Sequence, residues 1–329
     1  MYLIYVNLKD RLSLSFFYEL RALPILKNKG ESIMKERVFT GAASAIVTPL
    51  NENGIDYEKF ERLVEWQIAE GINAIVVCGT TGESSTLTDE EHKAAIKFVV
   101  DKVNKRVPVI AGVGSNDTAY GIELTEYACE VGADAMLVVT PYYNKATQNG
   151  LIQMFTKYAD VSTKPIILYN VPSRTGVNIA PSTCQALADH PNIVAVKEAS
   201  GNISQVAEIA HLCGDKLDIY SGNDDQIVPL MSLGGIGVIS VVSNVLPKET
   251  VEICNRWFSG DVAGSAKLQL ELLPFINSLF CEVNPIPVKA AVAAMGYCDN
   301  YLRLPLTRME SQNEEIMLGH MRELGIKLV

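Results

Sequence analysis

The sequence predicts an α/β fold, a closed (β/α)8 barrel of the TIM-barrel type followed by a C-terminal helical appendage. Two observations carry this prediction. From Phe39 onward, strand-like apolar runs alternate with amphipathic helical segments. The runs start roughly 20 to 35 residues apart, which is the spacing of βα units whose crossovers are helical. A series of eight such units implies a barrel.

The predicted strands are short runs of small or branched apolar residues, and they are 43–47, 74–78, 107–111, 135–139, 166–169, 193–197, 218–221 and 237–240. Runs that are apolar throughout indicate strands buried on both faces, as in a parallel sheet. The segments between them have apolar residues at helical spacing, and these predicted helices are 57–70, 89–104, 118–131, 148–160, 181–189, 203–212 and 224–233.

Residues at the ends of the predicted helices support this order of elements. Thr88 precedes three acidic residues, as a helix N-cap precedes first-turn carboxylates. Pro181 and Pro247 stand where helices start, a position at which proline removes no helical hydrogen bond. Gly71 and Gly132 follow helical segments and precede apolar runs, as loops from helix to strand require.

A doubly wound dinucleotide-binding fold would also alternate strands and helices. No G-x-G-x-x-G sequence opens a helix, however, and the segment 112–116 lacks the third glycine. We therefore favour a barrel over residues 34–261, with its last helix at 249–258. The C-terminal helical region, residues 262–329, is too small for an independent α/β domain. Its helical patterns are 262–280, 287–295 and 308–323.

Residues 1–33 differ in character from the rest of the chain. They carry a net charge of +2, whereas the whole chain of 329 residues carries −10. Their apolar stretches are too short to cross a bilayer, and no signal-peptide cleavage site follows them. We expect Met34 to be the physiological start, with residues 1–33 an upstream in-frame addition or, as the second possibility, a flexible extension.

The composition limits the classes of function. A hydrophobic fraction of 48% supports a large core, and the net charge of −10 without a basic stripe argues against nucleic acid and membrane surfaces as partners. The seven cysteines are scattered without a C-x-x-C pair, which favours reduced thiols in the cytoplasm. The four histidines lack metal-ligand spacing, so we expect no metal.

A lysine ends the buried strand predicted at 193–197. Burial disfavours the ammonium form of lysine, and a neutral amine can attack a carbonyl group to form a Schiff base. The alternative is that Lys197 reaches solvent or pairs with the neighbouring Glu198. The residue alone does not decide between these two interpretations.

Other reactive side chains follow the predicted strands, at the end of a barrel where active sites lie. The segment 79–84 offers two threonine hydroxyls and glycine-freed N–H groups that suit a carboxylate, although an ordinary turn has the same composition. Tyr142 and Tyr143 follow the fourth strand, where packing is the alternative role. Tyr169 can move protons and Arg174 can grip a carboxylate, with core and surface roles as alternatives. Together with Lys197, these side chains indicate a class I aldolase or a related Schiff-base lyase that acts on an α-keto acid.

Three segments resemble signatures of the dihydrodipicolinate synthase family, which belongs to the pyruvate-dependent class I aldolases related to N-acetylneuraminate lyase. They are GTTGES at 79–84, YNVPSRTG at 169–176 and VKEASGN at 196–202. The resemblance covers the chain from about Phe39 to the C-terminus, with the motifs in the family's order. Arg174 favours this family over N-acetylneuraminate lyases and keto-deoxy-sugar aldolases, which share the lysine and the tyrosine.

The resemblance implies a reaction and the roles of particular residues. Pyruvate would form an imine with Lys197, and the resulting enamine would attack L-aspartate-4-semialdehyde in a step of diaminopimelate and lysine synthesis. No cofactor beyond this covalent imine is implied. The implied catalytic residues are Lys197, Tyr169, Thr80 and Tyr143, with Tyr143 reaching a neighbouring subunit of a homotetramer built from dimers. The implied substrate-binding residues are Thr81, Arg174, Gly222 and Ile239.

The resemblance also implies a possible effector pocket for lysine between subunits. The matching positions are Ser84, His92, Asn116 and Tyr142. Tyr120 stands where lysine-sensitive members have a glutamate, so a partner for the effector's ammonium is missing and we expect weak or absent inhibition. Two rival functions remain open: another pyruvate-dependent lyase acting on a sugar, and a non-catalytic pyruvate-binding barrel.

Overall fold

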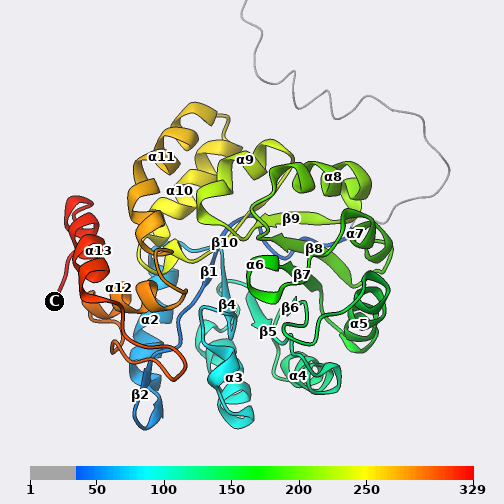
Figure 1. Cartoon of the computed structure of the whole chain (residues 1–329), viewed down its shortest axis with the longest axis horizontal. Helices are drawn as coiled ribbons and strands as arrows, with labels where there is room; N and C mark the ends of the chain where they lie inside the picture. Colours follow the sequence, from blue (N-terminus) through cyan, green and yellow to red (C-terminus); the bar gives the residue numbers. More distant parts are fainter. Residues whose placement is uncertain (1–34) are drawn as a thin grey trace, which may run out of the picture. The chain divides into compact units, whose positions relative to one another are not determined.

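A computed structural model of the chain describes residues 35–329, so the predictions for residues 1–33 and for Met34 lie outside the described residues. Eight parallel strands close into a barrel in which β1 lies between β10 and β4 (Figure 1). The strands are β1 (Gly41–Ala45), β4 (Ala74–Val77), β5 (Val109–Gly112), β6 (Ala135–Val139), β7 (Ile166–Asn170), β8 (Ile193–Glu198), β9 (Asp218–Ser221) and β10 (Gly237–Ser240). The predicted (β/α)8 barrel is confirmed.

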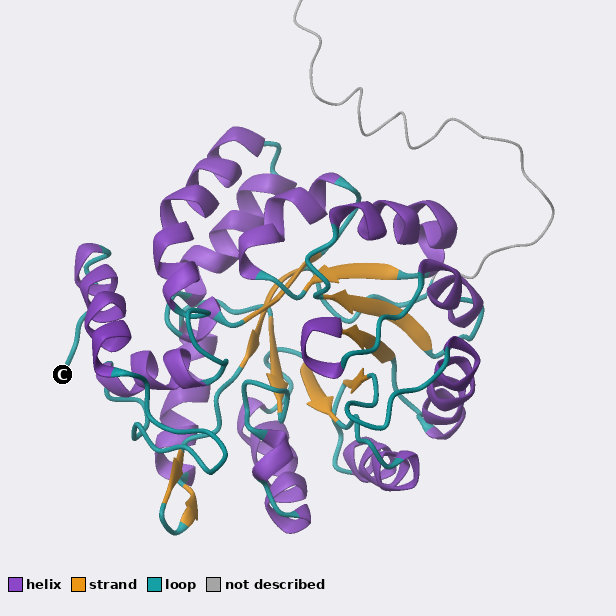
Figure 2. Cartoon of the chain, in the orientation of Figure 1, coloured by secondary structure: helices purple, strands orange, loops and turns teal. Residues whose placement is uncertain are grey.

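Helices surround the strands on the outside of the barrel (Figure 2). They are α2 (Tyr57–Ala69), α3 (Asp89–Val103), α4 (Thr118–Glu130), α5 (Gln148–Val161), α7 (Pro181–Leu187), α8 (Ile203–Cys213), α9 (Ile227–Ser232) and α10 (Pro247–Phe258). The Thr88 hydroxyl caps α3 by accepting a hydrogen bond from the Glu91 N–H at 3.2 Å. Gly71 and Gly132 have φ angles of 87° and 93° at the predicted helix ends.

Three elements differ from the predictions. The helix predicted at 224–233 is divided, because the Asp224 carboxylate turns back and accepts hydrogen bonds from the N–H groups of Val241 and Val242. Only 227–232 is therefore α-helical. The hairpin of β2 (Leu50–Asn51) and β3 (Gly54–Ile55) and the short helix α6 (Pro172–Thr175) were not predicted, because each has too few residues to show a period.

The alternation of side chains along the strands produces two layers of core. Side chains such as Ala195 and Ile239 fill the inside of the barrel, while their neighbours Val196 and Val238 pack against the helices. The ring of Phe39 stacks on the ring of Tyr220 inside the barrel, with ring centroids 4.3 Å apart. A packed interior of this kind makes the barrel a rigid support for the groups at its rim.

The C-terminal helical region consists of α11 (Val262–Ser278), α12 (Ile286–Ala294) and α13 (Ser311–Glu323). Helix α11 packs against α10 and α13, and α12 packs against α13 (Figure 1). Helix α13 begins at Ser311 rather than at 308, since Glu310 has an extended backbone with a ψ angle of 133°. The N–H of Glu310 donates to the Glu282 carboxylate at 3.0 Å. Within residues 35–329, no helix has the length and apolar character needed to cross a membrane.

Candidate active site

Lys197 lies on the inside of the barrel near the C-terminal end of β8, and it is only 5% exposed. The next residue, Glu198, points outward, where it accepts hydrogen bonds from the side chains of Asn170 and Gln205 at 2.9 and 3.0 Å. The N–H of Ser200 also donates to Glu198, at 2.7 Å. The structure therefore does not show the alternative in which Glu198 neutralises the lysine.

Tyr169 is the neighbour of Lys197 on the adjacent strand, since the two residues are register partners of β7 and β8. The Lys197 Nζ lies 4.3 Å from the centroid of the Tyr169 ring, a distance typical of a cation–π contact. Tyr169 is 7% exposed and belongs to the inner layer of the core. The amine and the phenol are thus held together by the register of two central strands rather than by mobile loops.

Gly222 provides the space that the Lys197 side chain occupies. A Cβ atom at Gly222 would lie 2.6 Å from the Ala199 Cβ and 3.1 Å from the Lys197 Cε. Any larger residue would therefore push the lysine aside. Ile239 lies in the inner layer on β10, at the same end of the barrel.

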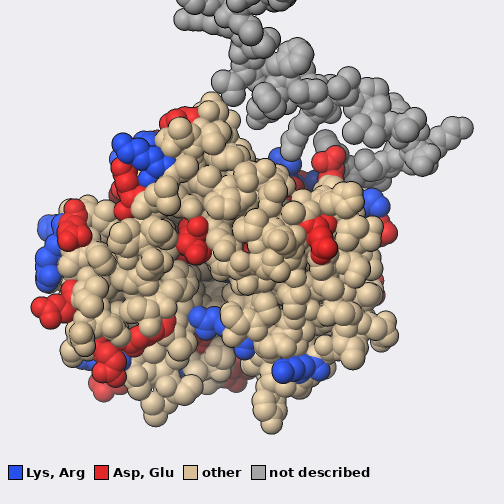
Figure 3. Space-filling model, turned by 45° about the horizontal axis from the view of Figure 1, so that its top comes forward, with Lys and Arg blue, Asp and Glu red and all other residues tan. Residues whose placement is uncertain are grey.

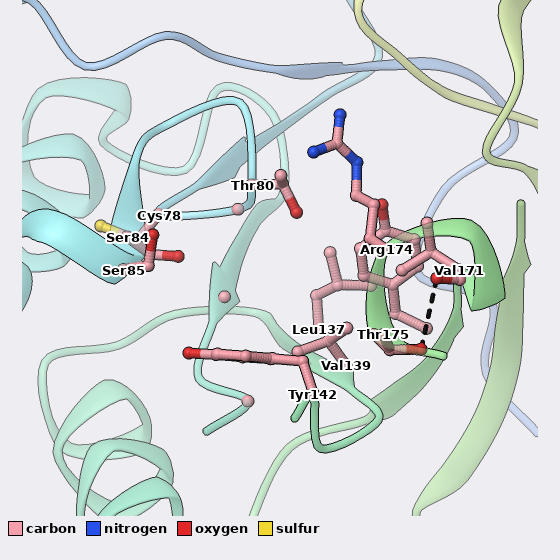
Figure 4. A pocket seen from close by; sticks show the side chains of 14 residues that line it. Cys78, Thr80, Ser84, Ser85, Leu137, Val139, Tyr142, Val171, Arg174 and Thr175 are labelled. Atoms are coloured by element: carbon pink, nitrogen blue, oxygen red, sulfur yellow. Dashed lines mark hydrogen bonds between the residues drawn. The ribbon is translucent and has the colours of Figure 1, made fainter. Parts of the chain in front are cut away.

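A cavity of about 220 Å³ opens between the loops at this end of the barrel. Its polar lining includes Thr80, Tyr142, Tyr169 and Arg174. In Figure 4, Arg174 extends from the short helix α6, and Tyr142 reaches in from the loop after β6. Three of these side chains are the predicted catalytic or carboxylate-binding residues, and the fourth, Tyr142, was assigned to the effector pocket.

The C-terminal region supports the two predicted carboxylate-binding residues. Asn284 Nδ2 donates to the Thr81 hydroxyl at 3.1 Å, and the main-chain oxygen of Asn284 accepts from Arg174 Nη2 at 3.2 Å. Thr81 is 3% exposed, so its hydroxyl has a fixed environment. Sequence reasoning missed Asn284, although its position just before Pro285 and helix α12 marks a defined turn.

A buried ion pair fixes the loop that carries Thr80 and Thr81. The side chains of Glu83 and Lys289 are both 0% exposed and contact each other directly, and Lys289 Nζ also donates to the Thr48 carbonyl at 2.7 Å. Glu83 has a φ angle of 56°, in the left-handed region that few side chains adopt. Arg303 adds a second link, since its Nη1 donates to the Thr86 carbonyl of this loop at 2.9 Å. Its guanidinium also donates hydrogen bonds of 2.5 and 2.6 Å to the Glu91 carboxylate on α3.

Of the four predicted catalytic residues, Thr80 and Tyr169 line this cavity, and Lys197 lies behind it in contact with Tyr169, whereas Tyr143 points away from the chain. It is 94% exposed, and its φ angle of 71° is also left-handed. Asn116 holds the residues on either side, since its Oδ1 accepts from the Tyr142 N–H and its carbonyl accepts from Asn144 Nδ2, both at 2.9 Å. The loop thus presents Tyr143 outward from the chain.

The site geometry agrees with the comparison of this chain with protein families. The profile of the dihydrodipicolinate synthetase family matches residues 38–321. The chain belongs to this family. A curated 4-hydroxy-tetrahydrodipicolinate synthase of Acetivibrio thermocellus is 55% identical over 293 residues, which span 89% of this chain and 100% of the relative. One from Lachnoclostridium phytofermentans is 56% identical over 291 residues, or 88% and 99% of the two chains.

Solved structures of dihydrodipicolinate synthases share the fold. The synthase of Aquifex aeolicus aligns with a TM-score of 0.87 at 43% identity, covering 88% of this chain and 99% of its own. The chloride-inhibited synthase of Acinetobacter baumannii, solved in complex with pyruvate, aligns with a TM-score of 0.86 at 45% identity and the same two coverages. Both alignments extend over almost the whole of the family domain.

The four residues assigned to a possible effector pocket have different surroundings within the chain. Ser84 and Tyr142 line the cavity that also contains Thr80. His92 is buried with Nε2 2.8 Å from the Gly112 carbonyl oxygen, and its burial lowers the pKa of the imidazole. Asn116 is engaged by the loop of Tyr142.

Tyr120 lies beside the Asp89 carboxylate, close to this group of residues. Its partial burial, followed by the nearness of Asp89, raises the pKa of the Tyr120 phenol to about 12. Asp89 in turn forms an ion pair with Lys93 at 2.9 Å, and hydrogen bonding to Lys93 lowers the pKa of Asp89. The Asp89 carboxylate beside Tyr120 is therefore already paired with a cation of the chain, Lys93.

Proposed function

We propose that this chain condenses pyruvate with L-aspartate-4-semialdehyde through an imine on Lys197, as a 4-hydroxy-tetrahydrodipicolinate synthase. The observation that carries the proposal is the position of Lys197, buried inside the barrel at the catalytic rim and in contact with Tyr169. A structural lysine would instead extend to solvent or pair with a carboxylate. The high identity to curated synthases over their full lengths supports the same reaction.

The proposed chemistry assigns each step to a side chain of the site. Lys197 Nζ attacks the keto carbon of pyruvate and water leaves, which gives an iminium ion. The positive nitrogen then withdraws electrons, so the methyl group loses a proton and becomes an enamine carbon that attacks the aldehyde. Tyr169, in contact with Lys197, is the proposed acid and base for these proton transfers. The mechanism needs no cofactor beyond the covalent imine.

Hydrogen-bond donors at the rim suit the two carboxylate groups of the substrates. We assign the pyruvate carboxylate to the Thr81 hydroxyl, with main-chain contacts from Gly222 and Ile239, and the semialdehyde carboxylate to Arg174. The whole chain carries a charge of −10, so the attraction of these anions must be local. Figure 3 shows a hollow in one face of the molecule with basic side chains at its lower edge and acidic side chains at its upper edge.

The exposed position of Tyr143 supports an oligomeric active site. We propose that Tyr143 enters the site of a neighbouring subunit and continues a hydroxyl relay from Tyr169 through Thr80. Its 94% exposure and its fixed flanking residues fit this role, because a large aromatic ring held in water gains nothing within its own chain. The proposed assembly is a homotetramer built from such dimers, and the seven free thiols fit a reducing cytoplasm.

An assay of purified protein with pyruvate and different aldehydes tests the proposed reaction. We expect turnover with L-aspartate-4-semialdehyde and none with N-acetylmannosamine or with aldose-derived aldehydes. Turnover only with the sugar aldehydes would show instead a sugar-specific lyase of the same chemistry. Binding of pyruvate without covalent trapping or turnover would show a non-catalytic barrel.

A further inference from the structure

Asn284 connects the two residues that we assign to the substrate carboxylates. Thr81 comes from the loop after β4 and Arg174 comes from α6 after β7, whereas Asn284 precedes α12 in the C-terminal region. Its side chain contacts Thr81 and its main-chain carbonyl contacts Arg174, at the distances given above. Asn284 is itself 5% exposed, so its contact with Thr81 is shielded from water, whereas its contact with the exposed Arg174 side chain is only partly buried.

The contact with Asn284 determines what the Thr81 hydroxyl can do. A threonine hydroxyl has one hydrogen to donate and two lone pairs that accept. Asn284 Nδ2 donates to the Thr81 oxygen and therefore occupies a lone pair rather than the hydrogen. The O–H of Thr81 is left to donate elsewhere, which is the state needed to bind a carboxylate.

The segment that contains Asn284 is anchored to the same loop a second time. Lys289, on α12, forms the buried ion pair with Glu83, two residues after Thr81. These two links fix the distance between the C-terminal region and the loop after β4. A group held in this way loses little conformational entropy when a substrate binds.

We propose that Asn284 is a positioning residue for both carboxylate-binding groups: its amide orients the Thr81 hydroxyl as a donor, and its carbonyl fixes the guanidinium of Arg174. The inference rests on the function proposed above. It assigns to the C-terminal helical region a direct part in substrate binding, in addition to its packing on the barrel.

Borohydride trapping with increasing pyruvate tests this role, because it measures pyruvate binding without the second substrate. We expect N284A to raise the pyruvate concentration for half-maximal trapping by about tenfold, the size of one lost hydrogen bond to a charged group. N284L, which keeps the branch at Cγ but is larger than asparagine and donates no hydrogen bond, should give the same shift and covers the case in which N284A does not fold. In a T81A background, N284A should cause no further shift.

A control at the other end of the barrel separates this role from a general loss of stability. Asn192 Nδ2 donates to the carbonyls of Ala159 and Ser162 at 2.9 and 2.8 Å, so N192A removes comparable amide bonds far from the rim. N192A should lower the melting temperature and leave half-maximal trapping unchanged. An unchanged or lowered half-maximal concentration in both Asn284 variants, or a further shift in the T81A background, would overturn the inference. Failure of the wild-type chain to be trapped would instead overturn the proposed function itself.

Discussion

Two loops at the rim of the barrel hold a residue in the left-handed backbone region, but the side chain of that residue is buried and paired in one loop and exposed in the other. In the loop after β4, Glu83 has a φ angle of 56° and its carboxylate forms a fully buried ion pair with Lys289. In the loop after β6, Tyr143 has a φ angle of 71° and its side chain is 94% exposed. A strained backbone persists where its surroundings determine it, and strain of this kind clusters at functional sites.

The two loops therefore have different proposed roles. The loop after β4 carries the proposed relay residue Thr80 and the proposed substrate-binding residue Thr81, and the C-terminal helical region of the chain fixes this loop. In the loop after β6, Asn116 holds the residues on either side of Tyr143, and the Tyr143 side chain is presented to its surroundings. We infer that one chain contains the whole carboxylate-binding part of the site. The last hydroxyl group of the proton relay, that of Tyr143, would come from a second copy of the chain.

Breaking the ion pair between Glu83, in the loop after β4, and Lys289 should have the largest effect on stability. E83Q leaves a buried ammonium group without its counter-charge, and we expect a loss of about 3–5 kcal/mol in the free energy of unfolding. Urea denaturation of the wild type and of E83Q measures this loss of unfolding free energy. The matched control is D101N, which breaks the exposed ion pair of Lys97 with Asp101 and should leave stability within experimental error. Equal effects of the two substitutions would contradict the idea that the loop is held by this pair.

Removing the hydroxyl group of Tyr143, in the loop after β6, should lower turnover without lowering stability. We expect Y143F to lower kcat by about a hundredfold, the contribution of one proton-transfer group, with an unchanged melting temperature. Mixing Y143F with inactive K197A subunits should restore activity, because a hybrid assembly then contains an intact Lys197 beside an intact Tyr143 from the partner. Absence of recovery in verified hybrid assemblies would place Tyr143 outside the neighbouring site.

A smaller, pH-dependent effect should follow from the ion pair between Arg303 and Glu91, which lies in the first turn of α3. Hydrogen bonding to Arg303 holds the pKa of Glu91 below its usual range. The folded state therefore gains stability from this carboxylate above the usual glutamate pKa of about 4.3, and the gain is lost as the pH falls through the lower folded-state pKa. The difference in urea midpoint between the wild type and R303M should be largest at neutral pH and should shrink below about pH 4. A difference independent of pH would show that the link is not ionic.

The smallest expected effect concerns lysine as an inhibitor. Tyr120 lacks a carboxylate for the effector's ammonium, and the adjacent Asp89 is already paired with Lys93. We therefore expect weak or absent inhibition by lysine in the wild type and stronger inhibition in Y120E, measured as inhibition constants. A submicromolar constant for the wild type would show that other groups in the interface bind the effector.

Most of the barrel and the position of Lys197 were predictable, because both follow from local patterns. Apolar runs with a regular spacing gave the strands, and the reactive residues directly follow those runs. The supports of the site were not predictable in this way. Glu83 and Lys289 are separated by 206 residues, and Thr81 and Asn284 by 203, so nothing in the local sequence pairs them. The outward position of Tyr143 depends on hydrogen bonds that Asn116 accepts from Tyr142 and Asn144, and the sequence suggested Asn116 only as part of an effector pocket.

The central claim is that Lys197 carries pyruvate as an imine. Incubation with pyruvate and sodium borohydride, followed by mass spectrometry of proteolytic peptides, tests it most directly. We predict that the peptide containing Lys197 gains the mass of a reduced pyruvate adduct, that K197R gains none, and that omission of pyruvate abolishes the label. A wild-type protein that stays unlabelled, or one labelled at a different lysine, would contradict the account.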